Sequence, residues 1–395
     1  MSSLEASNAP LLPGSILGMM GGGQLGRMWA HAAQRMGYFT AVLDPDGESP
    51  AGRISHFHIQ TAYTDPAGLA ELSRLSEAIS TEFENVPAQA LAALAQARPV
   101  YPEASSVAIA QDRASEKSHF ASCGVPCAPY ALIETLSHCA GAAVDLFPGI
   151  LKTSRLGYDG KGQVRVNSQA ELESAWRTLG EVPCVLEKML PLLWECSVVV
   201  ARALDGTCVN LPVQRNLHRD GILVMTEVYE GNVPEDLAVR AIEAAKAIAR
   251  NLAYVGVLCV EFFVLDPSSP EGQFLGGLVV NEMAPRPHNS GHYSIDACDV
   301  SQFELQVRCM GRLPIVQPRQ HSAAIMLNLM GDLWLQGTPP WERILALPGA
   351  HLHLYGKTDA SKGRKMGHLT ITAGNHAEAR ATATRAANLL GIAAI

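Results

Sequence analysis

Apolar runs alternate with amphipathic segments near the N-terminus, and this alternation predicts strands and helices in turn. Residues 15–20 and 39–43 are apolar enough for buried strands, and residues 27–36 have the spacing of an amphipathic helix. A glycine-rich turn at 21–26 separates the first strand from the helix. The order strand, helix, strand is a βαβ unit, which predicts a doubly wound parallel sheet for the first domain.

Changes in this pattern divide the chain into segments. A chain of 395 residues exceeds what one hydrophobic core usually supports, so we expect several domains packed together. Later segments mix strands and helices, and a last helix is predicted at 377–390. The predicted organisation is α/β and α+β, with a loose tail at 1–14, an N-terminal α/β domain at 15–110, a small domain at 111–190, a larger α+β domain at 191–312 and a C-terminal subdomain at 313–395 packed on it.

Two glutamates interrupt apolar runs that otherwise predict buried strands. Glu261 lies in the middle of one run and Glu282 ends another. An ionised carboxylate in such a strand is costly unless it is paired, hydrogen-bonded or bound to a metal. One interpretation is a salt bridge to a nearby arginine, Arg286. The other is a magnesium ion bridging nucleotide phosphates, with Asn281 adding a neutral oxygen, which makes phosphoryl transfer the first hypothesis.

Composition excludes several classes of partner. The net charge is −8, so we do not expect the basic surface that binding to nucleic acid or to an anionic membrane requires. The nine cysteines include no C-x-x-C pair, which argues against a zinc ribbon or a disulfide framework and favours a reducing, cytoplasmic compartment. Residues 1–14 lack the basic start of a signal peptide, and no apolar stretch approaches the ~18 residues of a membrane span. Small-molecule chemistry is therefore expected.

The glycine turn admits three interpretations. Gly21, Gly23 and Gly26 match the dinucleotide fingerprint, and Asp44 ends the following strand, so NAD is one candidate. Glycines at a helix start also let an anionic group approach backbone N–H groups, so a phosphorylated substrate fits the same turn. A tight turn without a ligand is the third interpretation.

Lysine is concentrated in two stretches, although the chain has only eight. Lys152, Lys161 and Lys188 bracket the glycine-rich loop 157–163, and a second group lies near the C-terminus. A lysine ammonium is a compact charge suited to phosphates. The loop lacks the serine or threonine of a Walker A sequence, so it is either a lid over a triphosphate or a hairpin turn with an exposed lysine.

A polar loop follows the second glutamate directly and contains His288 and His292. Histidines four residues apart suit zinc on a helix, but the Asn-Ser-Gly turn between them opposes a helix. The alternative is a loop that holds a substrate, in which one of the two histidines transfers a proton.

Five motifs together resemble one known family. They are Gly-Gly-Gly-Gln-Leu-Gly-Arg-Met at 21–28, Gly-Tyr-Asp-Gly-Lys-Gly-Gln at 157–163, Asn-Leu-His-Arg-Asp-Gly-Ile at 216–222, Asn-Glu-Met-Ala-Pro-Arg at 281–286 with His-Asn-Ser-Gly-His at 288–292, and Gly-Arg-Lys-Met-Gly-His at 363–368. In this order they resemble the N5-carboxyaminoimidazole ribonucleotide synthetases, ATP-grasp enzymes of purine synthesis, over residues 16 to about 370. The resemblance implies an ATP-grasp fold in which segment 111–190 is the lid domain.

The resemblance also implies which side chains bind each ligand. ATP would contact Arg113, Lys152, Gly157, Tyr158, Asp159, Gly160, Lys161, Gly162, Gln163, Glu187, Lys188, Met189, Leu190, Glu195, His218, Asn281 and Glu282. Magnesium would be held by Glu261 and Glu282. 5-Aminoimidazole ribonucleotide would lie against Gln24, Leu25, Glu84, Asn289, Ser290, Lys357, Arg364 and Lys365. The catalytic groups would be Tyr158, Asp159 and Lys161, which close over the site, and His288 or His292.

The activity implied is ATP- and bicarbonate-dependent carboxylation of 5-aminoimidazole ribonucleotide through carboxyphosphate. A homodimer is expected, and the product would pass to a separate mutase, because the sequence ends at Ile395 without the mutase domain of fungal and plant members. The alternatives are a formate-dependent glycinamide ribonucleotide transformylase of the same superfamily, an NAD-dependent dehydrogenase, and a non-catalytic nucleotide-binding module.

One residue departs from the family pattern. Leu156 stands before Gly157, where members usually have a second glycine. A left-handed backbone at this position would strain a leucine by about 1–3 kcal/mol. We therefore expect the loop to follow a different, unstrained backbone path.

Overall fold

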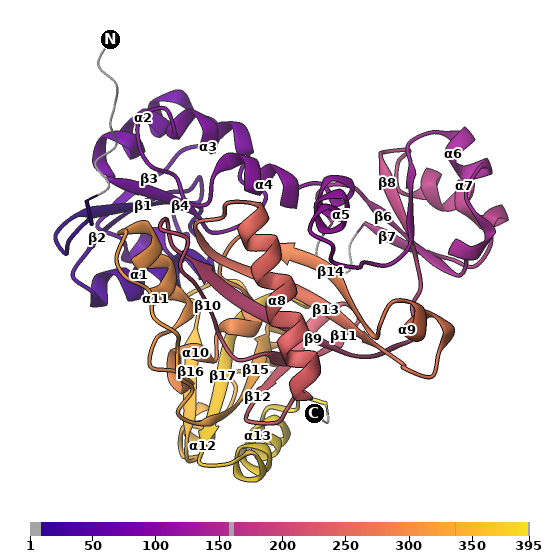
Figure 1. Cartoon of the computed structure of the whole chain (residues 1–395). Helices are drawn as coiled ribbons and strands as arrows, with labels where there is room; N and C mark the ends of the chain where they lie inside the picture. The colour runs from indigo at the N-terminus through magenta and orange to yellow at the C-terminus, as the bar shows by residue number, and fades with distance from the viewer. Residues whose placement is uncertain (1–8, 158–161, 336, 394–395) are drawn as a thin grey trace.

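Three β-sheets organise the computed structural model, which describes residues 9–157, 162–335 and 337–393 (Figure 1). The N-terminal sheet is entirely parallel, with strand order β3-β2-β1-β4. Its strands are β1 (Ile16–Met20), β2 (Phe39–Leu43), β3 (Phe57–Ile59) and β4 (Ala78–Thr81). Its helices are α1 (Gln24–Arg35), α2 (Pro66–Leu75), α3 (Ala88–Leu94) and α4 (Ala104–Ala110). The predicted doubly wound parallel sheet is confirmed.

Helix α1 begins three residues earlier than the sequence pattern suggests. Gly23 is its N-cap, so Gly26 lies in the first helical turn instead of in the preceding turn. Glu82, just after β4, accepts hydrogen bonds from the backbone N–H groups of both glycines. A carboxylate from a distant strand therefore satisfies the first turn of the helix, which local sequence patterns cannot reveal.

A small antiparallel sheet with strand order β5-β8-β6-β7 projects to the right of Figure 1. Helix α5 (Arg113–Ser122) precedes it, and α6 (Leu136–Ala140) and α7 (Gln169–Thr178) accompany its strands. The strands are β5 (Tyr130–Ile133), β6 (Gly149–Thr153), β7 (Gln163–Val166) and β8 (Cys184–Lys188). Leu151, Leu172 and Trp176 form the centre of its own small core.

The largest sheet has nine strands in the order β14-β13-β9-β11-β12-β15-β17-β16, with β10 paired to β9. The strands are β9 (Leu192–Arg202), β10 (Cys208–Asn210), β11 (Gln214–Arg219), β12 (Ile222–Val228), β13 (Gly256–Leu265), β14 (Leu278–Ala284), β15 (Ala323–Met330), β16 (Ala350–Leu354) and β17 (Lys365–Ala373). Helices on this part of the chain are α8 (Glu235–Asn251), α9 (Pro270–Phe274), α10 (Ser294–Ala297), α11 (Gln302–Met310), α12 (Trp341–Leu345) and α13 (His376–Leu390). The β12–β15 pairing makes the last segment of the chain part of this sheet.

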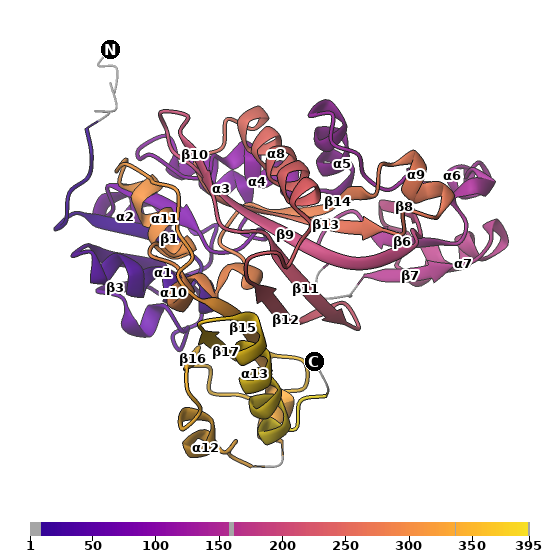
Figure 2. The same cartoon turned by 60° about the horizontal axis from the view of Figure 1, so that its bottom comes forward.

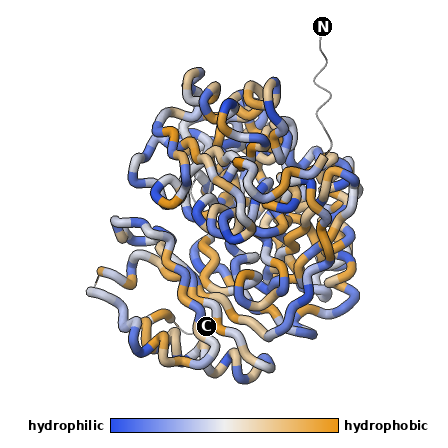
Figure 3. The backbone as a smooth tube through the Cα atoms, turned by 90° about the vertical axis from the view of Figure 1, so that its left-hand side faces the viewer, coloured by the Kyte–Doolittle hydropathy of each residue, from blue (hydrophilic) through white to orange (hydrophobic). Residues whose placement is uncertain are grey.

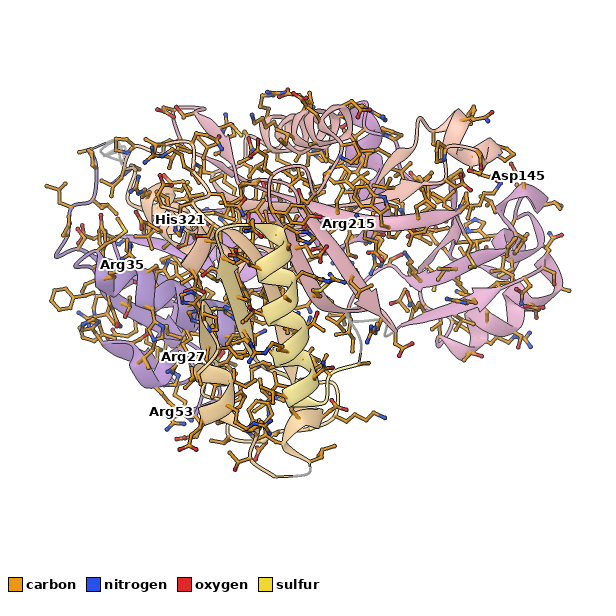
Figure 4. The ribbon with its side chains drawn as sticks, turned by 90° about the horizontal axis from the view of Figure 1, so that it is seen from below. Arg27, Arg35, Arg53, Asp145, Arg215 and His321 are labelled. Atoms are coloured by element: carbon orange, nitrogen blue, oxygen red, sulfur yellow. The ribbon has the colours of Figure 1, made fainter. Side chains whose placement is uncertain are left out.

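Helix α11 joins the N-terminal sheet to the large sheet. Phe303 and Val307 pack with residues of α1, and Leu305 and Cys309 pack with the large sheet. Arg35, labelled in Figure 4, adds an ion pair at 3.1 Å to Glu304 of the same helix. Opposite faces of one helix therefore fix the relative position of two sheets.

Hydropathy along the chain follows this layering. Helix α13 lies across β15 and β17 (Figure 2), and its alanine-rich face packs on Ile325 and Leu369. Hydrophobic and hydrophilic stretches alternate along the backbone tube (Figure 3), and most of the large hydrophobic side chains of the strands are buried. Among the described helices, none combines the length and the apolar composition that crossing a bilayer requires.

Candidate active site

A cavity of about 650 Å³ opens where the three sheets meet. Its walls come from the ends of β1 and β4, the start of α5, strands β13 and β14, and the C-terminal segment around β17. It brings together thirteen of the residues predicted from the sequence: Gln24, Leu25, Glu84, Arg113, Gly157, Glu261, Glu282, His288, Asn289, His292, Lys357, Arg364 and Lys365.

Other predicted residues lie outside the cavity wall or outside the described residues. Beyond the wall are Lys152, Gly162, Gln163, Glu187, Lys188, Met189, Leu190, Glu195, His218, Asn281 and Ser290. Residues Tyr158, Asp159, Gly160 and Lys161 lie outside the described residues. The lid interpretation of their loop stays a prediction.

The two acidic residues face each other across neighbouring strands. Glu261 of β13 pairs in register with Glu282 of β14, and a bulge at this point leaves Asn281 out of the ladder. The Asn281 side-chain oxygen is buried and has no hydrogen-bond partner among the described residues. Burial raises the pKa of Glu261 to about 7, and the charge of Glu282 adds to the shift. Two facing carboxylates fit a hard divalent cation such as magnesium, whereas Asn281 lies beyond the cavity wall.

The salt-bridge alternative names the wrong arginine. Arg286 pairs with Glu84 at 2.5 Å, and this contact links the N-terminal sheet to the end of β14. Glu282 instead lies 3.2 Å from Arg113 at the start of α5. Arg113 was expected at the nucleotide, so its contact with a proposed metal ligand joins these two parts of the site.

A buried charge cluster lies behind Arg113. Glu187 at the end of β8 contacts Lys152 at 3.1 Å and Lys117 at 3.3 Å, and all three side chains are largely buried. Burial alone would raise the pKa of Glu187, but the two lysines lower it to about 2. Lys117 was not predicted from the sequence, although it follows Arg113 by four residues and therefore shares one face of α5.

Three more residues predicted at the nucleotide, His218, Glu195 and Lys188, form close contacts. His218 Nδ1 lies 2.9 Å from Glu195 Oε2, because β11 and β9 are neighbouring strands. Burial lowers the pKa of His218, but the hydrogen bond to Glu195 and the charge of Glu261 raise it above its usual value. Lys188 forms an ion pair at 2.9 Å with Glu271 of α9. Charged side chains therefore lie on β8, β9, β11 and β13, and we call this set the charged band.

The glycine turn is already occupied by carboxylates of the chain itself. Asp44 accepts hydrogen bonds from Gly22 N–H at 2.7 Å and from the Tyr63 hydroxyl at 2.6 Å. Glu82 accepts from Gly23 and from Gly26, the latter at 2.7 Å. These backbone donors cannot also hold a dinucleotide or a substrate phosphate. The NAD interpretation loses the N–H groups and the Asp44 carboxylate on which it depended. The phosphate interpretation stays a prediction, because Gln24 and Leu25 at the same helix start line the cavity.

A basic group lies on the opposite wall of the cavity. Arg364 donates to the backbone oxygen of Asp359 at 2.8 Å, and Lys357 donates to the backbone oxygen of Lys365 at 2.8 Å. Asn289 lies in the same cavity, and its buried side-chain nitrogen and oxygen have no hydrogen-bond partners within the described part of the chain. This wall therefore offers positive charge and an unpaired amide to an anionic, hydrogen-bonding ligand.

The two histidines do not form a zinc site. A 3-10 helix (Asn289–Gly291) separates them, His288 Nε2 lies 3.2 Å from Glu261, and His292 Nδ1 lies 3.0 Å from Gln302. Burial lowers the pKa of both imidazoles well below the usual histidine value, so both rings are neutral at pH 7.

Leu156 contradicts the expected loop path. Its φ is 61°, in the left-handed region that the sequence analysis expected the leucine to avoid, and its side chain is 74% exposed. The chain therefore keeps the backbone conformation that a glycine would adopt and accepts the steric strain. The hydrogen bond from Arg113 N–H to Ser154 O holds the backbone just before this residue at 3.0 Å.

Comparisons with known proteins define first the class and then the family. Residues 118–303 match the ATP-grasp domain, residues 15–111 the ribonucleotide synthetase preATP-grasp domain, and residues 324–382 the phosphoribosylaminoimidazole carboxylase C-terminal domain. The chain therefore has an ATP-grasp fold, as the resemblance implied.

Similarity to individual proteins extends over nearly the whole chain. It is 42% identical over 369 residues to the N5-carboxyaminoimidazole ribonucleotide synthase of Brucella melitensis, covering 91% of this chain and 97% of that protein. A solved N5-carboxyaminoimidazole ribonucleotide synthetase in complex with ADP superposes with a TM-score of 0.88 at 36% identity, over 97% of this chain and 98% of the other. The Aspergillus clavatus enzyme in complex with ADP and 5-aminoimidazole ribonucleotide gives 0.86 at 29% identity, over 96% and 99%. The chain belongs to the N5-carboxyaminoimidazole ribonucleotide synthase family.

Proposed function

We propose that this chain carboxylates 5-aminoimidazole ribonucleotide to N5-carboxyaminoimidazole ribonucleotide in purine biosynthesis, using ATP, magnesium and bicarbonate. The observation that carries the proposal is one cavity with two chemically different walls. The paired acids Glu261 and Glu282 form one wall, and the basic group with Asn289 forms the other. A nucleotide with its metal ion suits the first wall, and a ribonucleotide monophosphate suits the second.

The nucleotide would lie along the charged band between the small sheet and β13. Lys152 and Arg113 supply positive charge there, and each forms an ion pair with a carboxylate, Lys152 with Glu187 and Arg113 with Glu282. Glu187 and the residues just after β8 would meet the adenine, and Glu195 would meet the ribose. Bound magnesium would be held by Glu261 and Glu282 and would neutralise charge on the transferring phosphate.

Carboxylation would proceed in three steps. A bicarbonate oxygen attacks the γ-phosphorus of ATP, which releases ADP and forms carboxyphosphate. Carboxyphosphate breaks its C–O bond to give CO2 and phosphate. The substrate amine then adds to CO2, and its surplus proton leaves. Because carboxyphosphate is short-lived in water, Tyr158, Asp159 and Lys161 are proposed to close over the site during these steps.

The other candidate functions have less support. The dehydrogenase depended on the glycine turn, whose N–H groups are held by Asp44 and Glu82. The transformylase depended on superfamily membership, whereas the matching C-terminal domain and the similar proteins are those of the carboxylase.

Product analysis tests the proposed function. Purified protein with 5-aminoimidazole ribonucleotide, MgATP and ¹³C-bicarbonate should form a carbamate that carries the label, detected by rapid mass spectrometry. Labelled formate in place of bicarbonate should give no labelled product. Bicarbonate-independent ATP hydrolysis without a carboxylated product would refute the proposal. A homodimer, a cytoplasmic location and delivery of the product to a separate mutase are further parts of it.

A further inference from the structure

Three histidines lie around one carboxylate at the edge of the large sheet, where β16 and β17 lie beside α10 (Figure 1). His353 Nε2 and Asp296 Oδ2 form a hydrogen bond at 2.9 Å. His368 lies opposite His353 in the β16–β17 pairing, and the two rings stack with their centroids 4.5 Å apart. His351 is further away, with its Nδ1 atom 3.7 Å from Asp296 Oδ1. Asp296, His353 and His368 form the compact part of the cluster, because one potential ligand atom of each lies within 4.8 Å of the other two.

The His368 ring is completely buried, and one of its nitrogens has no partner. Its Nδ1 atom lies 3.0 Å from the Tyr355 hydroxyl oxygen. Its Nε2 atom is buried, and none of the described residues forms a hydrogen bond with it. A buried ring nitrogen without a partner is costly, so an ordered water or a metal ion is expected beside it. Because a tyrosine hydroxyl can both donate and accept, the Tyr355 contact orients the ring whichever nitrogen carries the proton.

The cluster is separate from the proposed active site. Asp296, His353 and His368 lie outside the cavity wall, although His368 ends one of the five sequence motifs. The ring of His292, which does line the cavity, lies 4.9 Å from the ring of His368. Helix α10 follows His292 closely and carries Asp296. The cluster therefore lies behind one wall of the cavity and has no role in the proposed binding of ATP or substrate.

The chemistry of the three side chains favours a transition-metal ion. Two imidazoles and one carboxylate suit Zn²⁺ and similar ions, whereas magnesium prefers oxygen ligands. Around a tetrahedral zinc ion, neighbouring nitrogen or oxygen ligands lie about 3.3 Å apart, so the cluster is at most about 1.5 Å too wide. The two rings are within 11° of parallel, so an ion in the plane of both requires His353 to turn. That side chain is 28% exposed on the edge strand β16, so it can turn without displacing the core.

We propose that Asp296, His353 and the Nε2 atom of His368 bind one Zn²⁺ ion, or a similar first-row transition-metal ion, outside the active-site cavity. A water molecule would take the fourth tetrahedral position. The ion would connect α10 to the β16–β17 pair, and it would thereby fix the chain just after the polar loop 288–292. The proposal does not depend on the proposed function.

Zinc binding to the full chain, expressed without a histidine tag, tests the proposal. Metal-free protein would be titrated with Zn²⁺ by isothermal titration calorimetry in excess Mg²⁺. Asp296→Asn and His353→Gln each remove one ligand. The matched control is His376→Gln: His376 Nε2 is also buried without a hydrogen-bond partner and lies 3.9 Å from Glu227, but no third ligand among the described residues completes a set there. A second control, Glu282→Gln, removes a ligand of the proposed magnesium site.

We expect one Zn²⁺ per chain. Asp296→Asn and His353→Gln should each weaken binding by more than the roughly 10- to 100-fold that loss of an outer partner of a metal ligand causes. Both controls should bind Zn²⁺ as the unsubstituted protein does. Zn²⁺ should raise the unfolding temperature of the unsubstituted protein and not that of His353→Gln. X-ray absorption of the zinc-bound, unsubstituted protein should show two imidazole ligands, a result that does not depend on whether any variant folds.

Four results would overturn the proposal. They are absence of Zn²⁺ binding in excess Mg²⁺, undiminished binding by both Asp296→Asn and His353→Gln, loss of binding in Glu282→Gln, which would place the zinc ion at the proposed magnesium site, and an X-ray absorption spectrum without imidazole ligands. None of these results bears on carboxylation, which product analysis tests separately.

Discussion

Replacing Glu282 by glutamine separates a catalytic role from a structural one. In the structure Glu282 does two things: it pairs with Arg113 at 3.2 Å, and it faces Glu261 across the strands. The ion pair with Arg113 stabilises the fold, and the repulsion between the Glu282 and Glu261 carboxylates destabilises it. Glutamine keeps the shape, removes the pair and removes the repulsion.

The two magnitudes differ enough to be measured. The Glu282 side chain is 42% exposed, so its ion pair contributes at most about 1 kcal/mol, and the lost repulsion from Glu261 offsets part of that. Loss of a preorganised charge at the transferring phosphate typically costs about 10²–10³ in rate, or ~2.7–4 kcal/mol. We therefore expect kcat to fall by about 10²–10³ while the thermal unfolding temperature changes little.

The assay is substrate-dependent ADP release at saturating magnesium, with thermal unfolding of the same samples. Asp299→Asn is the matched control, because Asp299 is 36% exposed, pairs with Arg319 at 3.0 Å and lies outside the cavity wall. The control should lose a similar ion pair and keep its activity. Near-normal turnover in Glu282→Gln would refute the metal-ligand assignment, and a large loss of stability would show that its role is structural.

Three further changes test other parts of the account. Replacing Arg364 or Lys365 by alanine should raise the KM for 5-aminoimidazole ribonucleotide by about 10- to 100-fold, because each contributes a charge-assisted contact, and should leave the KM for ATP nearly unchanged in steady-state assays. Leu156→Gly should raise the unfolding temperature slightly, because relief of the left-handed strain, about 1–2 kcal/mol, exceeds the roughly 0.5–1 kcal/mol entropic cost of glycine. Burial raises the pKa of Glu116 to about 8, so the folded protein binds this proton more tightly than the unfolded chain and loses stability as pH rises from about 4.5 to about 8. The unfolding temperature, measured without magnesium, should therefore fall less between pH 6 and pH 8 for Glu116→Gln than for the unsubstituted protein.

Each of these changes has a result that would count against it. A rise in the KM for ATP alone would mean that the basic wall belongs to the nucleotide. An unchanged or lowered unfolding temperature for Leu156→Gly would show that the leucine is not strained. Parallel pH curves for Glu116→Gln and the unsubstituted protein would mean that Glu116 does not titrate in this range, although it accepts a hydrogen bond from Met283 N–H at 2.7 Å.

Local patterns predicted the elements whose neighbours in space are also neighbours in sequence. The βαβ unit, the acidic strands β13 and β14 and the last helix follow from apolar spacing, and all appear in the structure. Glu261 and Glu282, the carboxylates in these apolar strands, both line the cavity, and the magnesium site predicted from them stays a prediction.

Long-range partners were beyond those patterns. Glu82 accepts a hydrogen bond from the first turn of α1, although it lies more than fifty residues further along the chain. Arg286 pairs with Glu84 and not with the acids beside it in sequence. Lys117 became visible as part of the site only when β8 brought Glu187 against α5. In each case the decisive contact depends on how the sheets pack. The spacing of residues along one segment carries no information about that packing.

Leu156 shows a different limit. Propensity argues against a left-handed leucine, but propensities are averages of about 1–2 kcal/mol that surrounding structure can override. Here the paired strands β6 and β7 fix the two ends of the loop, so the backbone stays in the left-handed conformation at Leu156 and its side chain is exposed to solvent.

Transfer of oxygen from bicarbonate to phosphate tests the central claim most directly. If bicarbonate attacks the γ-phosphorus of ATP, ¹⁸O-labelled bicarbonate must leave one labelled oxygen in the phosphate released, in proportion to the carboxylated ribonucleotide formed. The measurement is mass spectrometry of the phosphate from a short incubation in unlabelled water, before bicarbonate exchanges its oxygen with the solvent. We predict one ¹⁸O per phosphate at full labelling. Phosphate that carries only solvent oxygen, formed along with the carboxylated product, would contradict the carboxyphosphate route.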